Sequence, residues 1–133
     1  MFSKFLNLES EKQDRIINAA TKVFAQKGYQ NASTNEIVKE AEISKGLLFH
    51  YFRNKKDLYL FLYDHLIEIF TKEIYEKIDW NEKDIFNKFR QTALIKLELF
   101  QQYPEMFKFI KAVYIEDSSD VKPDLDRRNK VIL

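Results

Sequence analysis

Apolar residues recur at helical spacing along most of the chain. One face of a helix predicted from about residue 10 carries Ile16, Ala20, Val23 and Phe24. A longer pattern runs from 54 to about 78 and is apolar on every side around 59–63, which predicts burial between two packed layers. With only two Gly and two Pro in 133 residues, the chain has few breaks. The pattern therefore predicts an all-α protein.

Short polar signals mark the expected ends of the first helix. Ser10 and Gln13 have the spacing of a capping box, so Ser10 is expected to cap this helix. Lys27 falls in its last turn, and Gly28 is placed to end it in a left-handed conformation.

A pair of short helices joined by a tight turn is predicted at about 33–52. Ser33 or Thr34 is expected to cap the first helix, and Ser44 to cap a second helix that begins at Lys45. Two short helices joined by a three-residue turn match the helix-turn-helix pattern, in which the second helix meets base edges in the DNA major groove.

The second of these helices has two different faces. Leu48 and Phe52 are separated by one helical turn and are expected to pack inward. The opposite face is left with Lys45, Gly46, Phe49 and His50. A small, basic, aromatic face of this kind suits insertion into the major groove.

The rear half predicts further helices. The apolar stripe of the first consists of Ile85, Phe89, Ala93, Leu97 and Phe100. Asn81 with Asp84 is expected to start this helix, and Pro104 to take the first position of another. The composition turns polar over 116–130, which predicts a loop, and the chain stops on the apolar residues 131–133 like an element cut short.

Composition excludes several classes of function. The absence of Cys excludes disulfides and thiol catalysis and removes the usual zinc ligands, so no metal site is expected. No glycine-rich phosphate loop or Ser/His/Asp signature is present, so neither an enzyme nor a cofactor site is predicted. The sequence has no 18-residue apolar stretch and no signal-peptide pattern, which predicts a cytoplasmic protein without a membrane partner.

The overall charge of +1 hides a small asymmetry. Residues 1–55 contain nine Lys and Arg against six Asp and Glu, a net charge of +3. Residues 56–133 contain 13 against 15, a net charge of −2. A mildly basic first part fits phosphate binding by that part of the chain.

Several linked motifs resemble the TetR family of bacterial transcriptional regulators. They are Gly28-Tyr29, Glu36-Ile37-Val38-Lys39, the run from Ser44 to Phe52, and Asn54-Lys55-Lys56-Asp57-Leu58. The resemblance implies a three-helix DNA-binding head over 9–69, with its helix-turn-helix at about 33–52. It also implies that 70–133 is the first part of a helical ligand-binding and dimerisation domain. Members of the family are usually longer, so a truncated chain is expected.

The resemblance assigns DNA-contacting roles to residues of the head. They are Ser33, Thr34, Asn35, Ser44, Lys45, Gly46, Leu47, Phe49, His50, Tyr51 and Lys55. Lys45 is expected to donate to guanine O6 and N7, and Phe49 to contact a thymine methyl group. His50, Tyr51 and Lys55 are expected to bind phosphates.

The remaining assignments concern the ends of the two short helices. Ser33 and Thr34 would offer hydroxyl and backbone N–H groups to a phosphate, and Asn35 is expected to reach a base edge. Gly46 would let the backbone approach the groove closely. For Phe49 and Tyr51, packing in the core is an equal alternative.

Two residues depart from the family pattern. Glu42 occupies a turn position where the family usually has Gly, and a positive φ there would cost about 1 kcal/mol. Leu47 replaces a residue that is commonly Thr or another polar type. Because leucine cannot donate a hydrogen bond, the base preference of a relative cannot be carried over.

The resemblance implies a ligand-responsive regulator. It would be a repressor that binds a palindromic operator as a homodimer and is released by a small, largely apolar effector. The effector pocket is left unassigned, since the aromatic residues after 58 and His65 are more simply read as core. The alternative function is a helical protein-interaction module without specific DNA binding.

Overall fold

The computed structural model describes residues 3–132, which form eight α-helices and no strand. They are α1 (Ser3–Leu6), α2 (Ser10–Asn31), α3 (Thr34–Ala41), α4 (Lys45–Tyr51), α5 (Lys55–Lys77), α6 (Ile85–Gln102), α7 (Pro104–Tyr114) and α8 (Lys122–Ile132). The predicted all-α fold is confirmed.

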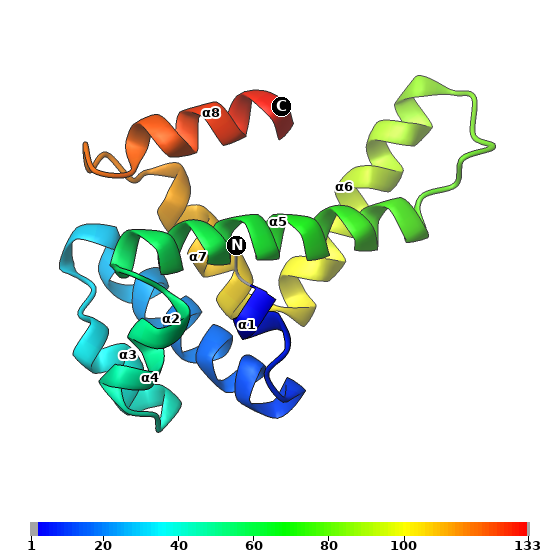
Figure 1. Cartoon of the computed structure of the whole chain (residues 1–133). Coiled ribbons are helices and arrows are strands. Elements are labelled where there is room, and N and C mark those ends of the chain that lie inside the picture. The colour runs from blue at the N-terminus through cyan, green and yellow to red at the C-terminus, as the bar shows by residue number, and fades with distance from the viewer. Residues whose placement is uncertain (1–2, 133) are drawn as a thin grey trace.

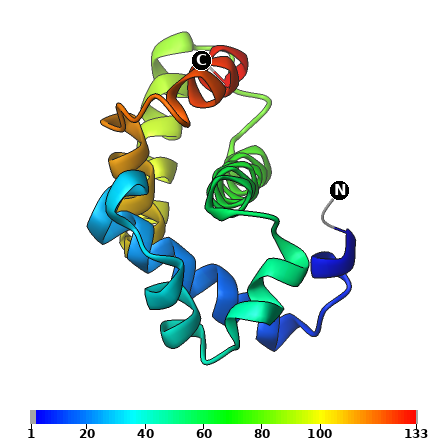
Figure 2. The same ribbon diagram turned by 60° about the vertical axis from the view of Figure 1, so that its left-hand side comes forward.

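Helices α2, α3 and α4 form a head at one end of the molecule. Figure 1 shows α5 running from α4 across the molecule toward α6, with α8 at the end opposite α3 and α4. Helix α2 packs against α3, α5 and α7. Figure 2, which views α5 almost end-on, shows α2 and α7 on one side of it and α1 on the other.

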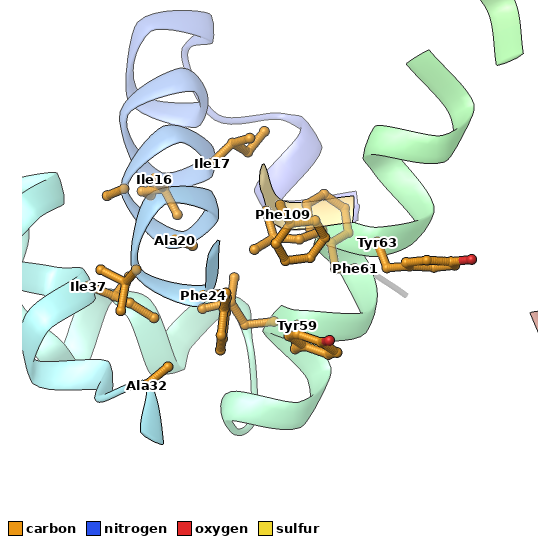
Figure 3. Close-up of a cluster of buried hydrophobic side chains, with 14 of the residues drawn as sticks. Ile16, Ile17, Ala20, Phe24, Ala32, Ile37, Tyr59, Phe61, Tyr63 and Phe109 are labelled. Atoms are coloured by element: carbon orange, nitrogen blue, oxygen red, sulfur yellow. The ribbon is translucent and has the colours of Figure 1, made fainter. Parts of the chain in front are cut away.

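The head and the rear helices share one buried core (Figure 3). The ring of Phe24 on α2 lies 5.0 Å from that of Tyr59 on α5, and Tyr59 lies 5.7 Å from Phe109 on α7. The predicted apolar face of α2 is buried, with Ile16, Ala20, Val23 and Phe24 all at most 4% exposed. A fully buried apolar side chain contributes about 1.5–3 kcal/mol, so these contacts fix α2 between α5 and α7.

The first half of α5 is buried on all sides, as its pattern predicts. Leu58, Tyr59, Phe61, Leu62 and Tyr63 are each at most 9% exposed. Asn54 caps the helix, its side chain accepting a 2.8 Å hydrogen bond from the backbone N–H of Asp57. This helix therefore links the head rigidly to the rear helices.

The expected capping box at the start of α2 is wrong. Ser10 is the first helical residue, and Glu9 precedes it without a side-chain cap. Gln13 donates instead to the backbone carbonyls of Leu6 and Leu8, at 3.0 and 2.6 Å. Gln13 thus ties the segment after α1 to α2, a use of its amide that capping-box spacing alone does not reveal.

Gly28 interrupts α2 with a positive φ, as predicted, but it does not end the helix. Gly28 has a positive φ of 74°, as predicted, but its ψ of −179° lies outside the left-handed helical region. The helix kinks there and continues to Asn31. At the start of α6, likewise, Asp84 is the cap, accepting from the N–H of Phe86 at 2.9 Å, and Asn81 is not.

The apolar stripe predicted for α6 is mostly exposed, and the helix packs through another face. Ile85, Phe89, Ala93 and Leu97 are exposed. The buried residues of this helix are Ile95 and Leu99, on the side where α6 meets α5 and α7. Only Phe100 of the stripe packs, its ring 5.4 Å from Phe70. No other described element covers the rest of the stripe, so its apolar pattern does not mark the core of this chain.

The polar segment expected to be a loop over 116–130 contains a helix. Helix α8 begins at Lys122 with Pro123 in its first turn, where proline is tolerated. Val121 and Leu125 are at most 2% exposed and anchor its first turn. The prediction that the chain is cut short at its apolar residues 131–133 concerns side chains outside those that the structure describes.

None of the described helices combines the length and the apolar character needed to cross a bilayer. Over the same part of the chain, no group of three or more His, Cys, Asp or Glu side chains is placed to hold a metal ion.

Candidate nucleic-acid interface

Helix α3 begins with the predicted cap. Ser33 has extended backbone dihedrals, and its hydroxyl accepts a 3.2 Å hydrogen bond from the N–H of Asn35. Thr34 is the first helical residue, and both it and Ser33 are half-buried, whereas Asn35 is exposed. The first turn of α3 therefore presents an amide side chain and backbone N–H groups at its positive dipole end.

The turn between α3 and α4 contains a left-handed residue. Glu42 has φ 57° and ψ 45°, and its N–H donates to the carbonyl of Lys39 at 3.3 Å. The N–H of Ile43 donates to Val38 at 3.1 Å, which closes the end of α3. Glu42 thus takes a positive φ at the position where the family usually has Gly, with a conformational cost of about 1 kcal/mol for a non-glycine residue.

Helix α4 is anchored from beneath and capped at its start. The Ser44 hydroxyl accepts from the N–H of Leu47 at 3.1 Å, as predicted. Leu48 and Phe52 are each 1% exposed and hold the helix on the head. These contacts fix which face of α4 points to solvent.

The outward face of α4 carries the predicted residues. Lys45, Gly46 and His50 are exposed, and Phe49 is 37% exposed. The ammonium of Lys45 lies 6.0 Å from the centre of the Phe49 ring. A Cβ at Gly46 would meet no atom within 4 Å, so the protein itself does not require glycine there.

Leu47 and Tyr51 flank this face and are half-buried. The ring of Tyr51 packs edge-on against Phe5, 5.8 Å between centroids, and lies 5.1 Å from His50. Tyr51 therefore belongs partly to the core, one of the two alternatives left open for it.

Phe5 is a core residue that the sequence did not identify. This residue of α1 is fully buried, and its ring lies 5.1 Å from Phe52 and 5.3 Å from Phe61. Helix α1 thus packs behind α4 and supports it. The only available signal was an aromatic residue in a short apolar run at the N-terminus, which does not identify a partner.

Lys55 has a role that the motif did not predict. Its ammonium donates to the backbone carbonyls of Tyr29, Gln30 and Ala32, at 2.8, 3.3 and 3.2 Å. It also lies 4.5 Å from the centre of the Tyr29 ring. An ammonium has three hydrogens, and all three are used at the C-terminal end of α2. A phosphate contact would require Lys55 to give up one of these bonds.

Tyr29 itself is part of the contact between the head and the segment before α8. Its hydroxyl donates a hydrogen bond to the carboxylate of Asp120. Burial raises the pKa of the Tyr29 hydroxyl, and the hydrogen bond to Asp120 raises it further. The tyrosine stays protonated and acts as a donor at neutral pH.

Residues 16–61 match the family model described as bacterial regulatory proteins, tetR family. The match begins in α2, includes α3 and α4, and ends in α5. It therefore covers the head and the helix that follows it.

Curated relatives agree with this match. The chain is 33% identical over 72 residues to the HTH-type transcriptional regulator HbdR of Aromatoleum sp. (strain CIB), covering 54% of this chain and 31% of that protein. It is 35% identical over 88 residues to the fatty acid metabolism regulator protein of Bacillus subtilis, covering 66% of this chain and 41% of that protein. The chain thus spans about three to four tenths of the length of these relatives. They are named as regulators, in agreement with the prediction that the chain is not an enzyme.

Solved structures share the fold. A TetR family transcriptional regulator from Chloroflexus aurantiacus superposes with a TM-score of 0.76 at 30% identity, over 86% of this chain and 53% of that chain. MexZ of Pseudomonas aeruginosa superposes with a TM-score of 0.73 over 93% of this chain and 60% of that chain, and at 20% identity this likeness concerns the fold alone. A helix-turn-helix head followed by further helices is therefore confirmed as the architecture. The chain belongs to the TetR family of bacterial regulatory proteins.

Proposed function

We propose that this chain is the DNA-binding part of a transcriptional regulator and that α4 enters the major groove. The observation that carries the proposal is the division of α4 into two faces. Leu48 and Phe52 hold it on the head, while Lys45, Gly46, Phe49 and His50 point to solvent. The proposed DNA-binding domain covers 9–69, and 70–133 forms the start of the rear domain.

The base contacts are proposed for the first turns of α4. The Lys45 ammonium would donate to guanine O6 and N7, and the exposed edge of Phe49 would contact a thymine methyl group. Gly46 would let the backbone of α4 approach the groove closely. A Cβ at this position would contact no atom of the protein and would project toward the groove instead. Leu47 is half-buried and would at most contribute an apolar contact at the edge of this surface.

Phosphate contacts are proposed on both sides of the groove. Ser33, Thr34 and Asn35 lie at the N-terminus of α3, where backbone N–H groups and the helix dipole favour an anion. Ser44 lies at the N-terminus of α4, and His50 is exposed at its C-terminal end. Tyr51 would reach a phosphate only through its hydroxyl, since its ring packs on the head.

For the whole regulator we propose a homodimeric repressor acting in the cytoplasm on a palindromic operator. Two symmetry-related heads would place two copies of α4 in successive major grooves, about 34 Å apart. A small, largely apolar effector would shift the separation of the heads and release the DNA. The supports for this proposal are the family and the shared buried core, through which α2 is packed directly on α7.

Fluorescence anisotropy of labelled DNA from upstream of the gene tests the proposal. Wild-type chain should bind with an affinity that falls steeply between low and physiological salt, as expected when several phosphates are neutralised. Lys45→Ala should weaken binding to the preferred sequence by about 1–3 kcal/mol. Lys96→Ala, an exposed lysine on α6, is the matched control and should bind like wild type.

Two outcomes contradict the proposal. One is the absence of DNA binding by the wild-type chain at low salt. The other is equal affinity of wild type and Lys45→Ala, which would favour a helical module that binds another protein through the same head.

A further inference from the structure

A pocket of about 670 Å³ lies where the head meets the rear helices. Its walls come from α2, from α5 and from the turn between α6 and α7. This volume falls in the range of sites that hold drug-sized molecules. We propose that the pocket binds a small organic cation, with an apolar body on the pocket floor and a protonated amine at Asp14.

The floor of the pocket is apolar. Ile17, Leu66 and Met106 line it and are at most 9% exposed. Thr21 is the only buried polar residue among the described ones, and its hydroxyl already donates to the carbonyl of Ile17 at 2.6 Å. The floor therefore offers no free donor and fits a hydrocarbon or aromatic body.

The charges at the rim favour a cation. Asp14 lines the pocket with its carboxylate exposed at the rim, and it forms no ion pair with any described side chain. Lys22 is the single basic lining residue, and its ammonium lies 3.4 Å from Glu40 outside the pocket. Glu105 adds a second carboxylate, whose partner Lys108 is 3.5 Å away on exposed surface. An ammonium at Asp14 would supply the partner that this carboxylate lacks.

His65 lies in the same wall and does not oppose a cation. Burial lowers the pKa of its imidazole, against the opposing effects of Glu68 and Asp14. A neutral imidazole carries no charge that repels an ammonium, and its unprotonated nitrogen can accept a hydrogen bond.

A chain of ring contacts links this wall to the outward-facing helix of the head. The imidazole of His65 stacks on Phe61 at 5.6 Å, Phe61 lies 5.3 Å from Phe5, and Phe5 lies 5.8 Å from Tyr51 of α4. An occupant of the pocket also touches both α2 and the α6–α7 turn. Occupancy should therefore weaken DNA binding, a consequence that rests on the proposed function.

Calorimetric titration of the whole chain with three matched probes tests the site. The probes are 4-phenylbutylammonium, 4-phenylbutanoate and 4-phenylbutanol, which share a body and differ in head-group charge. The ammonium should bind once per chain and about tenfold more tightly than the carboxylate, because the exposed carboxylate of Asp14 attracts the first probe and repels the second. Equal affinity for these two probes, or no binding of the ammonium, would overturn the assignment.

Variants locate the binding. Asp14→Asn should weaken binding of the ammonium about three- to fivefold, the effect of losing one exposed ion pair, and leave that of 4-phenylbutanol unchanged. Asp117→Asn, an exposed acid outside the pocket, is the matched control. Ile69→Trp should fill the pocket and abolish binding of all three probes. Ammonium affinity that survives both Asp14→Asn and Ile69→Trp would place the site elsewhere.

A second titration separates this inference from the proposed function. Saturating ammonium should lower the DNA affinity of the wild-type chain about threefold or more and leave that of Ile69→Trp unchanged. A chain that binds the ammonium at Asp14 but never binds DNA would retain the site and refute the proposed function. A chain that binds DNA but not the ammonium would refute the site alone.

Discussion

The backbone N–H of Tyr29 donates a 2.8 Å hydrogen bond to the carboxylate of Glu116, 87 residues further along the chain. Gly28 allows this contact, because its positive φ interrupts α2 one residue before Tyr29. The same carboxylate accepts from the N–H of Ser118 at 3.1 Å, and Asp120 accepts from the Tyr29 hydroxyl. The end of α2 is thus tied to the segment that leads into α8.

Removal of the Glu116 carboxylate should destabilise the chain. Glu116→Ala leaves the partly buried N–H of Tyr29 without its acceptor, which costs about 1–3 kcal/mol of unfolding free energy. Urea unfolding followed by circular dichroism measures this. Asp117→Ala, one residue further on and exposed, should change stability by less than about 0.5 kcal/mol. Equal stability of the two variants would show that the hydrogen bond contributes nothing.

The two glycines should respond to alanine in opposite ways. Gly28→Ala puts a Cβ at φ 74°, 3.4 Å from Glu116 Oε1, and should cost about 1–3 kcal/mol of stability. Gly46→Ala lies in α4 with open space around its Cβ and should stabilise the chain by about 0.5–1 kcal/mol.

For DNA affinity, the harmful substitution of the two should be Gly46→Ala. Gly46→Ala should weaken binding, since its methyl group would stand between α4 and the groove, whereas the folded fraction of Gly28→Ala should bind normally. Thermal unfolding together with anisotropy measures both effects. A Gly46→Ala variant that binds DNA like wild type would mean that α4 does not approach the bases closely.

Lys55 should matter for stability more than Lys45 does. Lys55→Ala removes three donors from the carbonyls of α2 and should cost about 1.5–3 kcal/mol, the range for hydrogen bonds to a charged group. Lys45→Ala removes an exposed side chain and should change stability by less than about 0.5 kcal/mol. If chemical denaturation gives equal values for both, the bonds of Lys55 do not persist in solution.

Alkaline pH should destabilise the core through Tyr59. Burial raises the pKa of its hydroxyl above the ordinary value of 10.0, with a smaller contribution from Glu116. The folded state therefore holds this proton more tightly than the unfolded state. The resulting stabilisation is complete below pH 10 and is lost as the pH rises toward the folded pKa, at up to about 1.4 kcal/mol per pH unit.

Tyr59→Phe tests this dependence. The phenylalanine keeps the ring contacts with Phe24 and Phe109 and removes the titrating group. Its unfolding free energy should decline less steeply above pH 10 than that of wild type, while Tyr75→Phe, at an exposed position, should follow the wild-type curve. Identical slopes for wild type and Tyr59→Phe would contradict the assignment.

The head could be predicted because its signals are local. Ser44 caps α4, and Leu48 and Phe52 pack one turn apart, so each relation spans a few residues and depends on helix geometry alone. The outward face of α4 is what remains once the buried side chains are fixed.

The contacts between distant segments could not be predicted. The partner of Lys55 is the end of α2, and that of Tyr29 lies 87 residues away, which no spacing rule identifies. Apolar periodicity also fails where two faces compete: Ile85 and Phe89 continue a regular stripe, yet α6 packs through Ile95 and Leu99. Tertiary neighbours decide which of the two faces is buried.

A backbone amide chemical-shift titration of the 16.0 kDa chain with its preferred DNA duplex would show directly whether α4 is the helix that reads DNA. The largest shifts should fall on 33–35 and 44–51, they should shrink as salt is raised, and Lys45→Ala should abolish them at low DNA concentration. Shifts concentrated on α6 and α7, with α4 unchanged, would contradict the assignment of α4 as the helix that reads DNA.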